Sequence, residues 1–344
     1  MLYKRLLQHR SVWMGIAIIW IVWYHSGIDF GLSILRHIQE IGYGGVDIFF
    51  FASGIGCYFS LSSDDDVGRF MKRRLTRLMP TYLIFIVFWL AYTAVIGSFH
   101  YQMAIGNIFA IQSFTGLGRG FNWYITTLLL FYILAPYFKK LIDKSSPVGK
   151  LLFLLFLIAF SIPFWGTAEY IVCVSRLPIF YFGMLSSSFC KSERKILPLH
   201  IIAACISFLI GTLALGFFTV YYPKYLWDYG LYWYPFILMT APLCMAISGI
   251  AIFLERFKIT KPIVSFLALC GKYSFEIYLV HVLFFAITRY LIKKQLVSGS
   301  GNLIWSITIL STVVGCVILR QLTNLIMRIA CKKGSKTHAN KSAE

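Results

Sequence analysis

The chain has 344 residues, of which 59% are hydrophobic and only 13% are charged. Soluble domains carry roughly 25% charged residues, so this composition excludes an ordinary soluble fold. The net charge of +19 does not indicate nucleic-acid binding, because most of the basic residues lie between apolar runs, where the cytoplasmic loops of membrane proteins are enriched in Lys and Arg.

Apolar runs long enough to cross a bilayer recur along the whole chain. Ten spans are predicted, at residues 11–31, 44–61, 79–98, 122–138, 150–166, 168–188, 197–219, 233–254, 270–289 and 302–324. Residues 99–121 form a shorter apolar stretch, which we expect to be re-entrant or interfacial. The pattern predicts an all-α polytopic helix bundle, with a membrane domain over residues 1–328 and a disordered basic cytoplasmic tail over residues 329–344.

The distribution of Lys and Arg predicts the orientation of these spans. With the N-terminus inside, the cytoplasmic segments hold 23 of these residues and the outer loops hold six. Because cytoplasmic loops are the basic ones, both termini are predicted to be cytoplasmic. The segment Arg289–Lys294 is the one outer loop that fits this rule poorly.

Eight cysteines are present, but no C-x-x-C pair occurs, and most lie inside apolar runs. We interpret them as small buried hydrophobic residues. Neither disulfides nor a metal site is expected.

Two ionisable residues fall in the first two spans. His25 lies in the outer half of the first span, and a histidine at membrane depth suits either a general base facing a cavity or a structural hydrogen bond. Asp47 lies in the first turn of the second span, which opens Gly44-Gly45-Val46-Asp47. It favours a helix-capping role, because a carboxylate there complements the helix dipole, although it could also orient a histidine on the first helix.

An arginine-rich loop precedes the third span. On a helix, Arg74 and Arg77 share a face, as do Arg73 and Arg77. Guanidinium groups at this spacing suit phosphate binding. The alternative is a topology signal with lipid headgroup contact.

Five further positions are candidates for a substrate or oxyanion site: Trp123, Arg176, Lys272, Tyr278 and His281. Trp123 starts the fourth span, where anchoring in the aromatic belt is the alternative, and Arg176 lies within a span and needs a partner or a water-filled cavity. In the ninth span, Lys272 and Glu276 are spaced to form a pair. Ser274, Tyr278 and His281 share one helix face. Such a polar stripe indicates either a cavity lining or hydrogen bonds between helices.

These segments, in their order, resemble the integral-membrane acyltransferase family 3, whose members are O-acyltransferases of bacterial surface glycans. The matching pieces span residues 10 to about 285 and are the first helix ending in His25, Gly45-Val46-Asp47-Ile48-Phe49-Phe50 with Ser53-Gly54, Arg73-Arg74-Leu75-Thr76-Arg77-Leu78-Met79-Pro80-Thr81-Tyr82, Trp123-Tyr124 with Phe131-Tyr132, Arg176 ahead of Phe180 and Gly183, and Tyr273-Ser274 with Ile277-Tyr278-Leu279 and His281.

The resemblance implies ten core helices in the bacterial cytoplasmic membrane, an acyl-CoA donor from the cytosol and a carbohydrate hydroxyl acceptor. It also implies that His25 is catalytic and that Arg74 and Arg77 help to hold the donor. One position departs from the family pattern, because Met14 stands where a basic residue is usual. Arg10, one turn earlier, is the nearest cation and either substitutes for it or leaves the motif degenerate. The acidic signature of the fourth span is also missing, since Thr126-Thr127 stand there.

The predicted function is therefore transfer of an acyl group, most simply acetyl, from acetyl-CoA to a sugar hydroxyl. His25, oriented by Asp47, would deprotonate the hydroxyl. Arg176, Tyr278 and Lys272 are candidates to stabilise the oxyanion. The alternatives are an acyl-histidine intermediate, a transporter or flippase of an acyl donor or lipid-linked glycan, and a catalytically inactive relative.

Overall fold

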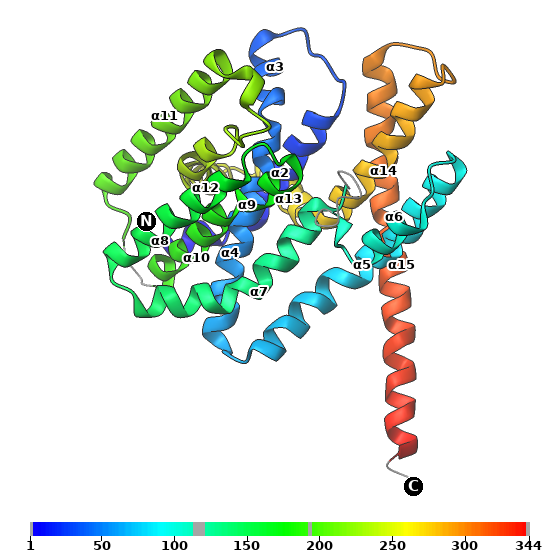
Figure 1. Ribbon diagram of the computed structural model, residues 1–344, viewed down its shortest axis with the longest axis horizontal. Coiled ribbons are helices and arrows are strands. Elements are labelled where there is room, and N and C mark those ends of the chain that lie inside the picture. Colours follow the sequence, from blue (N-terminus) through cyan, green and yellow to red (C-terminus); the bar gives the residue numbers. More distant parts are fainter. Residues whose placement is uncertain (1–2, 113–120, 192–194, 342–344) are drawn as a thin grey trace.

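The structure, a computed structural model, describes residues 3–112, 121–191 and 195–341. Within these ranges nine helical segments are long and apolar enough to cross a membrane, and no β-strand forms. The predicted all-α polytopic bundle is thus confirmed (Figure 1). The first of the ten predicted spans is shorter than expected, because α2 (Arg10–His25) has only 16 residues.

The long helices each match one predicted span, and they are α4 (Gly45–Ser63), α5 (Val67–Val95), α7 (Trp123–Lys144), α8 (Pro147–Ser161), α11 (Pro198–Tyr221), α12 (Tyr234–Leu254), α14 (Ser274–Lys293) and α15 (Gly301–Lys341). The sixth predicted span consists of two helices, α9 (Ala168–Val174) and α10 (Leu177–Lys191). Shorter helices and 3₁₀ turns connect them: α1 (Tyr3–Leu7), α3 (Ser33–Glu40), α6 (Tyr101–Ile108), α13 (Lys261–Lys272), and the turns Gly42–Gly44, Ile162–Phe164 and Pro223–Tyr225.

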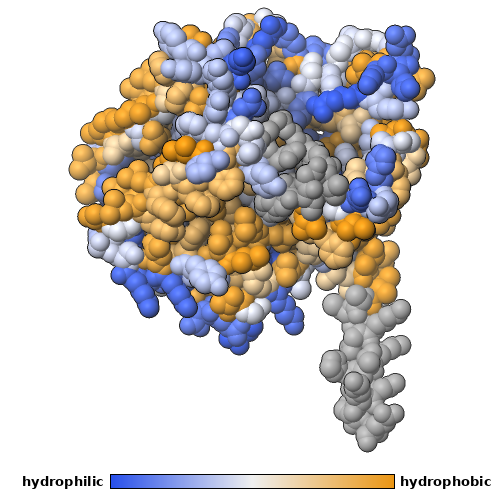
Figure 2. All heavy atoms as spheres, in the orientation of Figure 1, coloured by the Kyte–Doolittle hydropathy of each residue, from blue (hydrophilic) through white to orange (hydrophobic). Residues whose placement is uncertain are grey.

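The bundle has buried central helices and lipid-facing outer ones. In the most apolar part of α4, 78% of the residues are buried, whereas the corresponding share is 11% for α11. The exposed side chains of α11 are large and apolar, among them Ile201 and Leu213. Figure 2 shows hydrophobic side chains across the flank of the molecule, with hydrophilic ones gathered toward its two ends. This is the surface that a bilayer requires.

Two helix crossings in the core depend on glycine. A Cβ on Gly15 of α2 would lie 1.8 Å from the carbonyl oxygen of Leu267, and one on Gly271 would lie 1.8 Å from that of Ser11. The backbones of α2 and α13 therefore touch directly, as small residues permit in membrane helices. The crossing of α4 and α10 is of the same kind, with Gly54 against Phe180.

Two of the predicted spans are each interrupted by a break in the helix. The helix breaks between α9 and α10 at Arg176, and it breaks again between α13 and α14 at Tyr273. The ninth predicted span, residues 270–289, was expected to be one helix; it begins instead at Ser274 and follows a separate helix, α13. Discontinuous helices are tolerated at membrane depth where the freed backbone is buried or lines a cavity.

The apolar stretch at residues 99–121 lies partly outside the described residues. Its described part contains α6, which is held to its neighbours by side-chain hydrogen bonds. The Tyr82 hydroxyl of α5 donates to the Asn107 carbonyl oxygen, and the Thr126 hydroxyl of α7 donates to the Ala110 carbonyl oxygen.

The last helix continues beyond the tenth predicted span. Figure 1 shows α15 projecting past the rest of the bundle at its C-terminal end, and its helical backbone extends to Lys341. The division into a membrane domain and a disordered tail stays a prediction.

Candidate functional site

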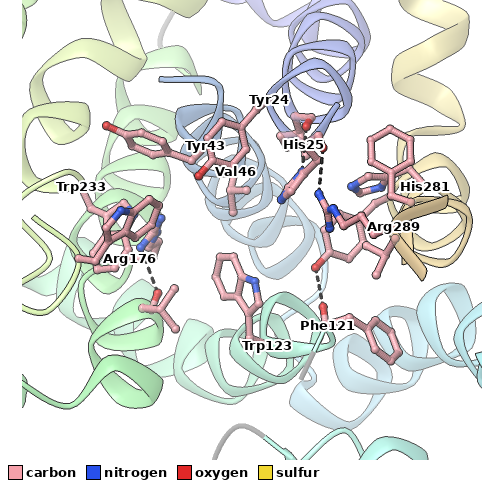
Figure 3. A pocket seen from close by; sticks show the side chains of 16 residues that line it. Tyr24, His25, Tyr43, Val46, Phe121, Trp123, Arg176, Trp233, His281 and Arg289 are labelled. Carbon is pink, nitrogen blue, oxygen red and sulfur yellow. Dashed lines mark hydrogen bonds between the residues drawn. The ribbon is translucent and has the colours of Figure 1, made fainter. Parts of the chain in front are cut away.

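Two cavities occupy the interior of the bundle. The first, of about 350 Å³, is called here the histidine cavity. It is lined by Ile21, Tyr24, His25, Tyr43, Val46, Phe121, Trp123, Val172, Arg176, Trp227, Trp233, Tyr278, His281, Val282, Phe285 and Arg289. The cavity is strongly aromatic, and none of these lining residues is a carboxylate. Figure 3 shows His25, Arg289 and His281 on one side of it, with Arg176 and Trp233 on the other.

His25 is the last residue of α2, and the end of that helix is held by two side chains. The Gln39 amide of α3 donates to the carbonyl oxygens of Trp23 (2.8 Å) and Ser26 (3.1 Å). The Arg289 guanidinium of α14 donates to the carbonyl oxygen of His25 itself, at 2.9 Å. These bonds add partners to carbonyl groups at the end of the helix. The position of the His25 backbone is therefore fixed from two sides.

The hydrogen bonds of the two histidines define their tautomer. His25 Nδ1 lies 2.9 Å from the Ile21 carbonyl oxygen, and His281 Nδ1 lies 3.1 Å from that of Ile277. A carbonyl oxygen only accepts, so each Nδ1 carries a proton and each neutral Nε2 has a free lone pair. The ring centroids are 5.3 Å apart, and His281 Nε2 is buried without a partner among the described residues. Both imidazoles are thus set up as bases toward the cavity.

Arg176 forms the opposite wall of the histidine cavity. Its guanidinium carbon lies 3.8 Å from the Trp233 ring centroid and 5.5 Å from that of Trp123. Its Nη1 donates to the Val172 carbonyl oxygen at 3.3 Å. The side chain is only 2% exposed, so the helix break at this residue places a cation inside an aromatic wall. Trp123, a predicted substrate-site candidate, also lines this cavity.

Asp47 pairs with Arg176 and not with His25. The Arg176 Nε and Asp47 Oδ1 atoms are 3.6 Å apart, and both side chains are 2% exposed. Asp47 is absent from the cavity lining, and Nδ1 of His25 is bonded to backbone instead. The expected orientation of His25 by Asp47 is therefore not formed among the described residues. A buried guanidinium needs a counter-ion more than a neutral imidazole does, which explains the choice of partner.

The second cavity, of about 340 Å³, is called here the arginine cavity. It brings together five cations, from α2, α5, α15 and the end of α13, with one carboxylate, Glu276. The five are Arg10, Arg74, Arg77, Lys272 and Arg320. An adjoining open groove between α2, α5 and α13 shares Arg10, Arg77 and Lys272 with it. Phosphate-bearing ligands suit such a concentration of guanidinium groups.

Only two of the three arginines expected to bind the donor enter this cavity. Arg74 donates to the Gly56 carbonyl oxygen at 2.6 Å and lies against the rings of Phe70 and Tyr132. Arg73 instead points away and pairs with Asp64 at 2.7 Å, with its side chain 44% exposed. Hydrogen bonds from the Arg69 and Arg73 guanidinium groups hold the pKa of Asp64 well below its usual range.

Arg10 lies close to Met14, the position where the family pattern has a basic residue and this chain does not. Arg10 and Met14 lie one turn apart on α2, and both line the arginine cavity. A Cβ on Gly56 would lie 3.0 Å from Arg10 Nη1 and 3.8 Å from Arg74 Nη1. The two guanidinium groups therefore meet over Gly56, so Arg10 supplies a positive charge to the same cavity that Met14 lines.

The expected pair between Lys272 and Glu276 is not formed. The helix break at Tyr273 separates them, so the spacing of four residues does not put them on one helix face. Glu276 accepts instead from Arg320 of α15, at 2.9 Å. Lys272 lines the arginine cavity with its Nζ 5.6 Å from the Tyr273 ring centroid.

The polar stripe of α14 runs from one cavity to the other. Ser274 lines the arginine cavity and His281 lines the histidine cavity, with Tyr278 between them lining both. The Tyr278 hydroxyl donates to the Phe121 carbonyl oxygen at 2.9 Å; this is the dashed line that ends at Phe121 in Figure 3. This bond occupies the proton that an oxyanion would need.

The sequence reasoning missed several lining residues. Arg289 was noted only in an outer loop that fits the topology rule poorly. Arg320 was not named as a site candidate, although a cation inside a span is itself a signal. Tyr43 and Trp233 carried no signal, since aromatic residues are abundant throughout this chain. Groups of three or more His, Cys, Asp or Glu that suit a metal ion do not occur among the described residues.

The chain is similar in sequence to known acyltransferases. Residues 14–321 match the acyltransferase domain family. Acyltransferase MdmB of Streptomyces mycarofaciens is 28% identical over 131 residues, which cover 35% of this chain and 34% of that protein. The match thus spans about a third of the length of this relative. No solved structure matches the chain.

Proposed function

The chain belongs to the acyltransferase domain family, acyltransferase family 3, and on this premise we propose that it transfers an acetyl group from acetyl-CoA to a hydroxyl of a surface-polysaccharide or lipid-linked sugar. The observation that carries the proposal is the pair of adjoining cavities: one holds five cations, the other holds two imidazole bases, and Tyr278 stands between them.

The arginine cavity is assigned to the donor. Coenzyme A carries a diphosphate and a 3′-phosphate, and five lining cations against one lining carboxylate give it a strongly positive site. The predicted topology opens this cavity toward the cytosol, where acetyl-CoA is found. Arg10, Arg74 and Arg77 would hold the phosphates, and the pantetheine arm would extend toward Tyr278.

The histidine cavity is assigned to the acceptor. Its aromatic side chains offer flat faces against which the C–H faces of a sugar ring pack. Arg176 is fixed by Asp47 and Trp233 and can donate to ring oxygens or hydroxyl groups. A mostly apolar pocket with a few placed polar groups is typical of a small-molecule site. The predicted topology opens it to the outer face of the bacterial cytoplasmic membrane.

His25 is assigned as the general base. The acceptor hydroxyl gives its proton to Nε2 of His25, and its oxygen attacks the thioester carbonyl carbon. The C–S bond then breaks as the ester C–O bond forms, and the coenzyme A thiolate leaves and takes up a proton. A positioned base of this kind contributes about 10²–10⁴-fold to the rate.

The test is acyl transfer by the purified protein in detergent. The protein is incubated with labelled acetyl-CoA and a panel of glycans and lipid-linked sugars, and coenzyme A release and labelled product are both measured. Release that depends on an acceptor, with label in the glycan, supports the proposal. Movement of label across vesicles without turnover would overturn it and would favour a transporter or flippase.

A further inference from the structure

Val46 and Tyr278 form the boundary between the two cavities. Of the described residues, only these two line both the histidine and the arginine cavity. Tyr278 contributes most of the boundary because its side chain is the larger. Its side chain is buried, with 7% exposed, and borders both cavities.

Three contacts hold the Tyr278 side chain in this place. Its hydroxyl donates to the Phe121 carbonyl oxygen at 2.9 Å. Its ring centroid lies 5.0 Å from that of Tyr124, on the side of the arginine cavity, and 5.7 Å from that of His281, on the side of the histidine cavity. The ring therefore stands between the proposed donor site and the two histidines.

This position matters because water competes with the acceptor. A thioester beside a neutral imidazole is open to hydrolysis whenever water reaches both, and enzymes suppress such side reactions by closing the site to water. The histidine cavity holds two imidazoles with free Nε2 lone pairs. A separation between them and the thioester is therefore needed until the acceptor is bound.

We propose that Tyr278 is the residue that directs the acetyl group to the acceptor rather than to water, by separating the thioester from the His25 side until the acceptor occupies the histidine cavity. The inference rests on the proposed function for the identity of the donor. Without the Tyr278 ring, a water molecule gives its proton to His25 Nε2 and attacks the thioester carbonyl carbon. The C–S bond breaks, acetate forms, and the coenzyme A thiolate takes the proton.

The first experiment measures coenzyme A release from acetyl-CoA without any acceptor, using a thiol reagent. Tyr278→Ala is expected to raise release on the order of 10²-fold above the original protein, because the substitution brings base, water and thioester together. The rise is expected to disappear in Tyr278→Ala/His25→Ala. Tyr290→Ala, the same change on the same helix but outside both cavities, is the matched control and should leave release at its original rate.

Two further variants are expected to give intermediate rates of coenzyme A release. Tyr278→Phe keeps the ring but loses the bond to Phe121, so its release should lie between those of the original protein and Tyr278→Ala. Val46→Ala trims the other boundary residue and should give a smaller rise, which keeps the test open if Tyr278→Ala does not fold. The inference would be overturned if Tyr278→Ala bound acetyl-CoA as tightly as the original protein and released coenzyme A at the original rate.

The second experiment does not depend on the donor. In a cysteine-free background, Ser53→Cys places a thiol in the arginine cavity. The anionic, membrane-impermeant reagent sulfonatoethyl methanethiosulfonate is added outside intact cells. The thiol should stay protected with Tyr278 in place and should react in the Tyr278→Ala variant. Equal protection in both would overturn the inference.

The two experiments distinguish failure of the inference about Tyr278 from failure of the proposed function. If the original protein does not bind acetyl-CoA, the proposed donor is wrong, and the labelling result still decides whether Tyr278 separates the cavities. If acetyl-CoA binds and is transferred while Tyr278→Ala changes neither release nor labelling, the proposed function stands and the role of Tyr278 is refuted.

Discussion

Removing one member of the buried Asp47–Arg176 pair should destabilise the protein more than removing both. The charged atoms are 3.6 Å apart, and each side chain is 2% exposed. At an effective dielectric constant of about 20, two unit charges at that distance attract by about 4.6 kcal/mol. Asp47→Ala leaves the guanidinium buried without its counter-ion, and Arg176→Ala does the same to the carboxylate. Loss of one partner of a buried pair typically costs about 3–5 kcal/mol.

The measurement is the free energy of unfolding in mixed SDS micelles, followed by far-UV circular dichroism. Each single variant is expected to lose about 3–5 kcal/mol, and Asp47→Ala/Arg176→Ala should lose no more than either one. Single losses below about 1 kcal/mol, or a double loss equal to the sum of the singles, would refute a coupled buried pair.

Three further outcomes are expected. Gly271→Ala puts a Cβ 1.8 Å from a backbone oxygen and should lower the free energy of unfolding by about 1–3 kcal/mol. Gly249→Ala is the control, because a Cβ there would have no neighbouring atom within 4 Å, and it should leave the free energy of unfolding unchanged. Equal effects of the two variants would contradict the close crossing of α2 and α13. Arg74→Gln should raise the KM for acetyl-CoA about 10–100-fold, since a hydrogen bond to a charged group contributes about 1.5–3 kcal/mol. Arg73→Gln should change this KM less than about fivefold. A larger effect of Arg73→Gln than of Arg74→Gln would contradict the assignment of the donor to the arginine cavity. The folded-state pKa of Asp64 lies below its unfolded value, so its contribution to stability is present above about pH 4 and is lost as the pH falls further. Asp64→Asn should therefore lower the thermal midpoint at pH 7 and lower it less at pH 3. The same decrease at both pH values would contradict the pairing of Asp64 with the arginines.

The architecture was predictable because a bilayer imposes a strong and simple pattern. Runs of about 20 apolar residues located the spans to within a few residues for helices such as α4 and α11. The apolar runs could not predict where a span is interrupted by a break in its helix. The break at Tyr273 lies near the start of the predicted ninth span. It stands next to Gly271, whose backbone contacts α2, a helix far away in the sequence.

The candidate site was predictable only where chemistry stood out against an apolar background. His25, Arg176 and His281 did so, and the structure places all three in one cavity. Their partners were not predictable from spacing along the chain. Asp47 is bonded across helices to Arg176, and Glu276 pairs with Arg320, because tertiary packing brings these groups together.

The central claim, that His25 is the base that serves an acceptor in the histidine cavity, is tested most directly by acceptor-dependent coenzyme A release in His25→Ala. His37→Ala, which removes an exposed histidine on α3, is the matched control. Loss of the base should lower the transfer rate by about 10²–10⁴-fold, with correct membrane insertion and unchanged binding of acetyl-CoA, while His37→Ala keeps its rate. Full transfer activity in His25→Ala would contradict the account.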